Sequence, residues 1–298
     1  MDIDPRVLKL IETEQYTQRT KEWYEARANL ITASSASNLL TRNSEVCDKY
    51  IETYGLQDTF YKDDKCCNPY SSKLNYYLDK CRGSTFKGNI ATYHGQKYEE
   101  VASNIYSVLT GKKIIEFGLI KHPTLPWLGA SPDGITTDGI MVEIKCPYRR
   151  KIDGIPPFYY YIQCLLQMEC CDLEVCDFIE FEFVEFKTER EWLDDLTLET
   201  PIHFKGVLLS INTSKSELPD PQFLEYIYPP KELLLVGDNV DTAALLNWKS
   251  TEIIKRVIAG VDINKIETIY WKVTDYAITK IERDPVWFKN VIPVFEKE

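Results

Sequence analysis

Apolar residues recur along this chain at two spacings, and the spacing separates predicted helices from predicted strands. Residues 5–15, 20–30, 89–110 and 158–169 carry the three- and four-residue spacing of a helix. Residues 114–121 and 276–283 predict strands, and residues 177–187 alternate apolar with acidic side chains, which predicts a strand with one face in water. Two short apolar runs, 127–130 and 140–144, flank a turn rich in Gly and Asp and predict a β-hairpin.

This mixture of helices and strands predicts an α/β fold with a mixed central β-sheet flanked by helices. The 298 residues are 44% hydrophobic, which is ample for a core of one large domain or two. The sequence has no apolar run of about 18 residues for a membrane span and no export leader. We therefore expect an intracellular protein that is neither secreted nor in a membrane. The nine cysteines lack paired metal-ligand spacing and are expected to be reduced thiols.

The net charge of −11 argues against a non-specific coat for nucleic acid. If the protein acts on nucleic acid, its basic groups must be concentrated at one cleft. The densest basic run is 149–151, and we expect it either to touch a DNA backbone or to form a solvated loop.

Candidate chemistry gathers on the predicted hairpin. Asp133 follows its first apolar run, and Glu143 and Lys145 lie two residues apart on the second, so they share one face of the strand. A buried carboxylate is costly unless it is paired or bound to a metal. Its oxygens suit magnesium or manganese, and a neighbouring lysine can orient water. The alternative is a surface hairpin with a Glu143–Lys145 ion pair.

A second candidate site lies near the N-terminus. Trp23 and Arg27 are four residues apart on one side of a predicted helix, and Ser34 lies where another helix begins. Free backbone N–H groups at a helix start, with an arginine nearby, favour a phosphate site. Ordinary helix capping beside a solvated arginine is the alternative.

The combined motif of the hairpin resembles a known family. Ser131-Pro-Asp-Gly followed by Glu143-Ile-Lys-Cys-Pro is similar to the PD-(D/E)xK nucleases, in the lambda-exonuclease and YqaJ branch of viral recombinases, also called alkaline exonucleases. The segments 23–34, 94–99, 160–168 and 283–288 resemble further motifs of that family, although Leu165 replaces one family glutamine. The resemblance implies a restriction-endonuclease-like core in a single nuclease domain spanning 1–298. It also implies insertions at 43–88, of helices and loops, and at 188–268, between two core strands.

The resemblance also implies roles for particular residues. Asp133, Glu143 and the backbone carbonyl of Ile144 would hold the catalytic Mg²⁺ or Mn²⁺, Glu99 would help with a metal, and Lys145 would position the attacking water. The residues that would hold the 5′-phosphate of the degraded strand are Arg27, Ser34, Ser131 and Gln163.

By resemblance, the expected function is metal-dependent 5′-to-3′ exonuclease activity on linear double-stranded DNA, leaving 3′ single-stranded tails for recombination. The implied partners are DNA with free ends, a single-strand annealing protein and further copies of the chain. Two other functions stay open. One is a structure- or sequence-specific endonuclease on the same fold, and the other is a catalytically inactive DNA-binding module.

Overall fold

The computed structural model describes residues 3–42, 47–83, 88–195, 204–215, 220–236 and 241–298. Parts of the two expected insertions, 43–88 and 188–268, therefore lie outside the described residues. The described chain forms a mixed α/β fold, which confirms the predicted fold class. The division into one domain with two insertions stays a prediction.

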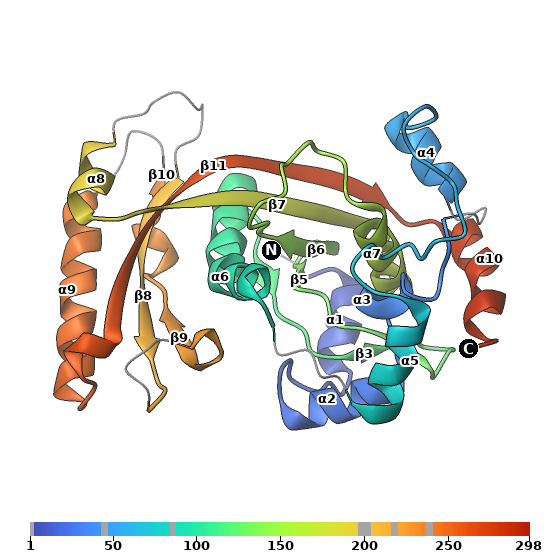
Figure 1. The fold of residues 1–298 in the computed structure, drawn as a ribbon, viewed down its shortest axis with the longest axis horizontal. Coiled ribbons are helices and arrows are strands. Elements are labelled where there is room, and N and C mark those ends of the chain that lie inside the picture. Colours follow the sequence, from blue (N-terminus) through green and yellow to red (C-terminus); the bar gives the residue numbers. More distant parts are fainter. Residues whose placement is uncertain (1–2, 43–46, 84–87, 196–203, 216–219, 237–240) are drawn as a thin grey trace.

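The larger sheet contains both parallel and antiparallel pairs. Its strand order is β10 (Leu235–Val236), β8 (Phe204–Asn212), β11 (Ile266–Glu282), β7 (Val175–Phe186), β6 (Ile140–Lys145), β5 (Gly134–Thr136) and β2 (Ile114–Ile115), with β9 (Leu224–Ile227) also paired to β8. Only β6 and β7 are parallel in this sheet as described, and the other pairs are antiparallel. The long strands β7 and β11 connect the two ends of the molecule (Figure 1).

The predicted hairpin was partly wrong. The first run, β4 (Leu128–Ala130), belongs to a separate three-stranded sheet with β1 (Ile31–Thr32) and β3 (Ile120–Lys121). The partner of β6 is instead β5, which follows Asp133 directly. Pro132, which has no N–H group, lies in the segment where the chain leaves one sheet for the other. The strand predicted over 114–121 is likewise divided, because β2 and β3 lie in different sheets.

Ten helices are described, besides short 3₁₀ turns. They are α1 (Pro5–Glu12), α2 (Lys21–Ala28), α3 (Ala33–Ala36), α4 (Asp48–Tyr54), α5 (Lys73–Arg82), α6 (Ile90–Thr110), α7 (Phe158–Cys171), α8 (Glu189–Asp194), α9 (Thr242–Ile258) and α10 (Pro285–Phe295). Among the described residues, none of these helices has both the length and the apolar character needed to cross a membrane.

Strand β6 separates two parts of the core. Val142 and Ile144 pack in a cluster with residues of α6, whereas Met141 packs in a second cluster with residues of α7. Since side chains alternate along a strand, Glu143 and Lys145 share the face of Met141, toward α7. Glu143 and Lys145 therefore lie on one face of β6, as expected, and α7 covers that face.

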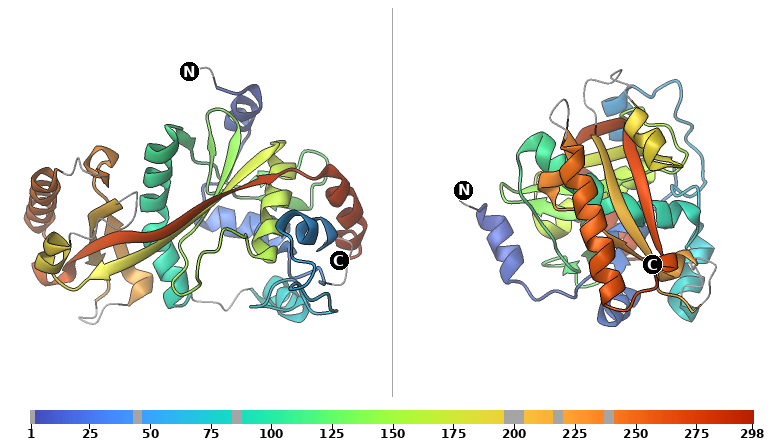
Figure 2. Two further views of the ribbon diagram at one scale, coloured as in Figure 1. Left: turned by 90° about the horizontal axis from the view of Figure 1, so that it is seen from above. Right: turned by 90° about the vertical axis from the view of Figure 1, so that its left-hand side faces the viewer.

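The far end of the molecule contains β8, β9, α8 and α9, which lie beside the ends of β7 and β11 (Figures 1 and 2). A small apolar cluster holds this end together, formed by Trp192, Val207, Leu245 and Tyr270. Strand β11 begins at Ile266, ten residues before the predicted strand, and pairs with both β7 and β8. This end thereby continues the central sheet.

Arg283 joins the end of β11 to the end of α7. Its guanidinium donates to both carboxylate oxygens of the buried Glu169, at 2.9 and 2.7 Å, and to Asp172 at 2.8 Å. We expect Arg283→Met to lower the free energy of unfolding by about 3–5 kcal/mol, because it leaves a buried carboxylate without its cation. Urea denaturation measures this change. Lys280→Met, which removes an exposed cation near Glu282, should cost less than about 0.5 kcal/mol, and an equal loss in both variants would contradict the prediction.

Candidate active site

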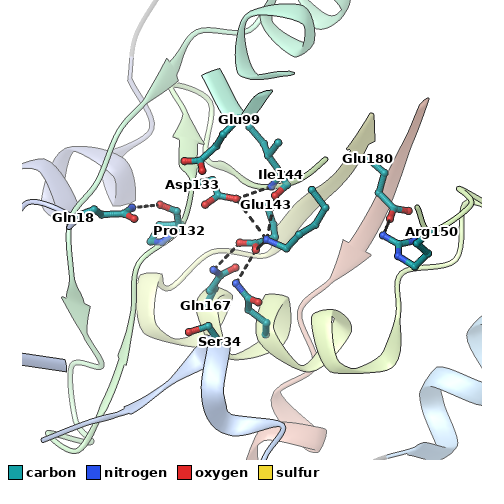
Figure 3. Close-up of polar contacts among 12 residues, drawn as sticks. Gln18, Ser34, Glu99, Pro132, Asp133, Glu143, Ile144, Arg150, Gln167 and Glu180 are labelled. Carbon is teal, nitrogen blue, oxygen red and sulfur yellow. Dashed lines mark hydrogen bonds and ion pairs between the residues drawn. The ribbon is translucent and has the colours of Figure 1, made fainter. Parts of the chain in front are cut away.

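Glu143 is the most buried charged group of the site, with none of its surface exposed. Two amides on α7 fix it: Gln163 Nε2 donates to Oε1 at 2.7 Å, and Gln167 Nε2 donates to Oε2 at 2.8 Å. Because the two glutamines are four residues apart, they project from one side of the helix. They hold both oxygens of the carboxylate in a defined orientation, as Figure 3 shows.

Lys145 places its ammonium group among three oxygens. It forms an ion pair with Glu143 Oε1, donates to the carbonyl oxygen of Ile144 at 3.1 Å, and lies 3.9 Å from Asp133 Oδ2. The ring of Tyr160 lies 4.9 Å from the ammonium nitrogen. Asp133 is itself oriented by the backbone N–H of Ile144, which donates to Oδ2 at 2.7 Å. The turn before β5 and the end of β6 thus hold their charged groups in one place.

These charges change one another's protonation. Burial, followed by the negative charge of Asp133, raises the pKa of Glu143 to about 7. Burial alone would lower the pKa of Lys145, but the carboxylates of Glu143 and Asp133 raise it well above its ordinary value. The two carboxylates thus favour the protonated, cationic form of Lys145.

Glu99, on α6, lies on the other side of Asp133 and forms an ion pair with Arg19, at 2.8 Å between Nη2 and Oε2. Burial and the charge of Asp133 raise the pKa of Glu99, while Arg19 and Lys145 oppose the rise. No sequence motif points to Arg19, which lies in a polar segment.

The N-terminal segment is fastened to the turn that carries Asp133. Gln18 Nε2 donates to the carbonyl oxygens of Phe117 and Pro132, both at 2.9 Å. Trp23 Nε1 donates to Ser131 Oγ, also at 2.9 Å. Ser131, two residues before Asp133 in the chain, is thereby held by the same helix that carries Arg27.

Arg27 and Ser34 are in direct contact, with Nη2 of Arg27 donating to Ser34 Oγ at 3.0 Å. The guanidinium stacks on Trp23, 4.1 Å from the ring centroid. Lys80 of α5 donates to the carbonyl oxygens of Arg27 and Leu30, at 2.8 and 2.5 Å. Lysine near a helix C-terminus stabilises the last carbonyls of that helix.

Burial lowers the pKa of Arg27 to about 10, and burial together with Arg27 lowers that of Lys80 to about 8. Among the described residues, no carboxylate forms an ion pair with either group. Two partly buried cations without an acidic partner favour the binding of an anionic ligand. Neither a motif nor the apolar spacing of the sequence indicates that Lys80 belongs to this site.

A further ion pair lies beside β6. Glu180 of β7 is fully buried, pairs with Arg150 and stands in register with Lys145. The face of 177–187 predicted to be in water is thus covered at Glu180, because Arg150 and the loop before α7 lie over it. Arg150, one of the basic run, is fixed by this contact rather than free in solvent.

A cleft of about 630 Å³ lies beside Asp133 and Lys145 and extends to Ser34. It is lined by Ser34 and Glu99, by Asp133, Ile144 and Lys145, by Arg149 and Arg150, by Gln163, and by four tyrosines, Tyr70, Tyr148, Tyr159 and Tyr160. The volume lies within the range of ligand-binding clefts, about 300–1,000 Å³. One open cavity is thus lined by Glu99, Asp133, Lys145 and Ser34, whereas Glu143, Arg27 and Ser131 are not among its lining residues.

The ligands available for a hard divalent ion are two side-chain carboxylates and one backbone carbonyl oxygen. In the described part of the chain, no three His, Cys, Asp or Glu side chains form a group that could hold a metal. The fitting set is Asp133, Glu143 and the carbonyl oxygen of Ile144, which already converge on the positive charge of Lys145. Carboxylate and carbonyl oxygens are the ligands that magnesium and manganese prefer.

The chain is thus a mixed α/β protein with a cleft that is lined by carboxylates, a lysine and a serine hydroxyl. Residues 22–174, just over half of the chain, match the model of the YqaJ-like viral recombinase domain, and the chain belongs to this family. The resemblance seen in the sequence motifs is thereby confirmed.

Individual relatives are more distant. The chain is 26% identical over 319 residues to an uncharacterized protein of Acanthamoeba polyphaga mimivirus, covering 95% of this chain and 52% of that protein. The chain therefore spans about half the length of this curated relative.

Among solved structures, the chain is similar to an alkaline exonuclease from Laribacter hongkongensis, with 23% identity, a TM-score of 0.36, and coverage of 80% of this chain and 98% of that one. It is also similar to a phage-related exonuclease from Haemophilus somnus, with 14% identity, a TM-score of 0.43 and coverage of 90% of each chain.

Gln167→Met removes one of the two amide donors to Glu143 while keeping a side chain of similar length. We expect the free energy of unfolding to fall by about 1.5–3 kcal/mol at pH 8, because a hydrogen bond to a buried charged oxygen is lost. The control is Gln222→Met, which removes a 2.7 Å bond of the same type to Asp220 on the surface. Chemical denaturation should show little change for the control, and equal losses would argue against a special role of Gln167.

Proposed function

We propose that this protein is a metal-dependent exonuclease that degrades linear double-stranded DNA in the 5′-to-3′ direction and leaves 3′ single-stranded tails. The observation that carries the proposal is the convergence of Asp133, Glu143 and the Ile144 carbonyl on the ammonium group of Lys145, beside a cleft that is lined by Asp133, Lys145 and Ser34. Membership in the YqaJ-like recombinase family supports a nuclease of this kind.

The acidic residues would hold the ion. Asp133, Glu143 and the Ile144 carbonyl are the proposed ligands of Mg²⁺, with Mn²⁺ as the alternative, and Glu99 adds negative charge beside them. When bound, the ion supplies Lewis-acid polarisation of the scissile phosphate and a more acidic water. Lys145, a cation in the same cleft, would orient the attacking water and offset negative charge that develops on the phosphate.

The groups near the N-terminus would select chain ends. Arg27, Ser34, Ser131 and Gln163 are proposed to hold the 5′-phosphate, with Lys80 fixing the backbone of Arg27. A terminal phosphate carries up to two negative charges, whereas a phosphodiester inside a chain carries one. A cationic site without an acidic partner therefore favours the terminal group. This local arrangement allows an acidic protein to bind DNA at one place.

Further parts of the proposal concern partners. The 3′ tails would be passed to a single-strand annealing protein, the substrate would be DNA with free ends inside a cell, and the chain would form a homo-oligomer. The competing functions are an endonuclease on the same fold and an inactive DNA-binding module. The two nuclease functions are separated by a covalently closed circle, which has no end to enter.

Digestion of a 5′-phosphorylated linear duplex tests the proposed activity. With magnesium present, we expect the unmodified protein to shorten the 5′-ended strand and leave a closed circular duplex intact. We expect Lys145→Ala to lower the rate at least about 100-fold, because the cation that orients water and offsets phosphate charge is lost.

The matched control is Lys255→Ala, which changes an exposed lysine on α9, away from the cleft, and should digest DNA at the normal rate. Cutting of the closed circle would favour the endonuclease. Full activity of Lys145→Ala would contradict the proposed mechanism.

Binding of the ion is testable without DNA. Manganese chloride should raise the unfolding temperature of the protein, because a ligand that binds only the folded state stabilises it by about 2.7 kcal/mol at 100 times its Kd. Asp133→Asn should abolish the increase. Asp138→Asn, an exposed carboxylate on the same hairpin, should keep it. A thermal-shift titration measures all three proteins, and equal shifts in both variants would exclude Asp133 as a ligand.

A further inference from the structure

Arg19 is a charged residue of the site that the proposed chemistry does not use. Its guanidinium forms the 2.8 Å ion pair with Glu99, and the two side chains are 54% and 38% exposed. Glu99 belongs to the acidic group that the proposed ion would enter, so its partner bears directly on how many ions the site accepts.

The backbone at Arg19 is unusual. The N–H of Thr20 donates to the carbonyl oxygen of Thr17 at 3.3 Å, which closes a turn with Arg19 at its third position. Arg19 has φ of 67°, in the left-handed region, where this turn position ordinarily takes glycine. A side chain is kept in such a conformation when the surrounding structure imposes it, and such positions cluster at functional sites.

Contacts on the N-terminal side fix this turn against the segments that directly precede β3 and β5. Gln18, directly before Arg19, donates to the carbonyl oxygens of Phe117 and Pro132. Two residues earlier, Tyr16 O accepts from the N–H of Leu119 at 3.0 Å. On the other side, Thr20 caps α2 through the N–H of Trp23. These hydrogen bonds hold the backbone on both sides of Arg19, whose guanidinium pairs with Glu99.

The charges of the site are consistent with one divalent ion. Glu99, Asp133 and Glu143 supply up to three negative charges, and Lys145 and Arg19 supply two positive ones. One divalent ion then leaves a single positive charge, which one phosphodiester group balances. A second ion would add two more positive charges without a further acidic ligand, and the number of charged ligands sets the affinity for such ions.

We propose that Arg19 takes the position of a second cation at Glu99, so that the site binds a single divalent ion. Arg19 is then a positioning residue that holds Glu99 away from metal coordination. This inference rests on the metal dependence of the proposed function and refines it. Removing the guanidinium should free Glu99 and open a second, weaker ion site.

Counting bound manganese by electron paramagnetic resonance, in the absence of DNA, tests the inference. We expect one ion per chain for the unmodified protein and two for Arg19→Gly, since glycine fits the left-handed turn and should leave the fold intact. Arg19→Lys, which keeps a cation, should retain one ion. Arg190→Ala, at a side chain that is 91% exposed on α8, is the control and should also bind one.

Two ions in the unmodified protein, or one ion in Arg19→Gly, would overturn the role of Arg19 and leave the proposed nuclease in place. If the unmodified protein binds no manganese but digests DNA without divalent ions, the metal-dependent function itself fails. The two failures are thus distinguishable in the same titration.

Discussion

The burial of the Glu143 carboxylate between β6 and α7 is the constraint on which the site and much of its surroundings depend. An ionised carboxylate in the core costs several kcal/mol unless its oxygens are hydrogen-bonded and its charge is compensated. Gln163 and Gln167 supply the hydrogen bonds, and Lys145 supplies the charge. Because both amides come from one side of α7, that side must face the strand, and the orientation of the helix follows.

The N-terminal segment completes the site from outside the sheet. Gln18 and Trp23 bind the turn around Pro132, while Arg19 and Arg27 bring positive charge to opposite parts of this region. The chain has a net charge of −11, yet Lys145, Arg149 and Arg150 line the cleft. The overall charge of the protein is therefore a poor guide to what this cleft binds.

The sequence predicted the elements better than their pairing. The helices over 20–30, 89–110 and 158–169 were confirmed as α2, α6 and α7, because apolar spacing on a helix is a local property. The hairpin was wrong in its first strand, since runs of three or four apolar residues do not specify which neighbour completes their hydrogen bonds. The same reason explains why the run over 114–121 was not recognised as two strands in two sheets.

The sequence by itself determined which residues share a face and which carry chemistry. Glu143 and Lys145 point to one side because strand geometry has a period of two, and the motif around them identified the family. Only the tertiary structure decided that Glu180 stands beside Lys145, that Lys80 reaches the end of α2, and that Glu99 is paired with Arg19. These contacts join residues that are far apart in the chain or on separate elements. A side-chain contact of that kind depends on how whole elements pack, and local spacing carries no information about it.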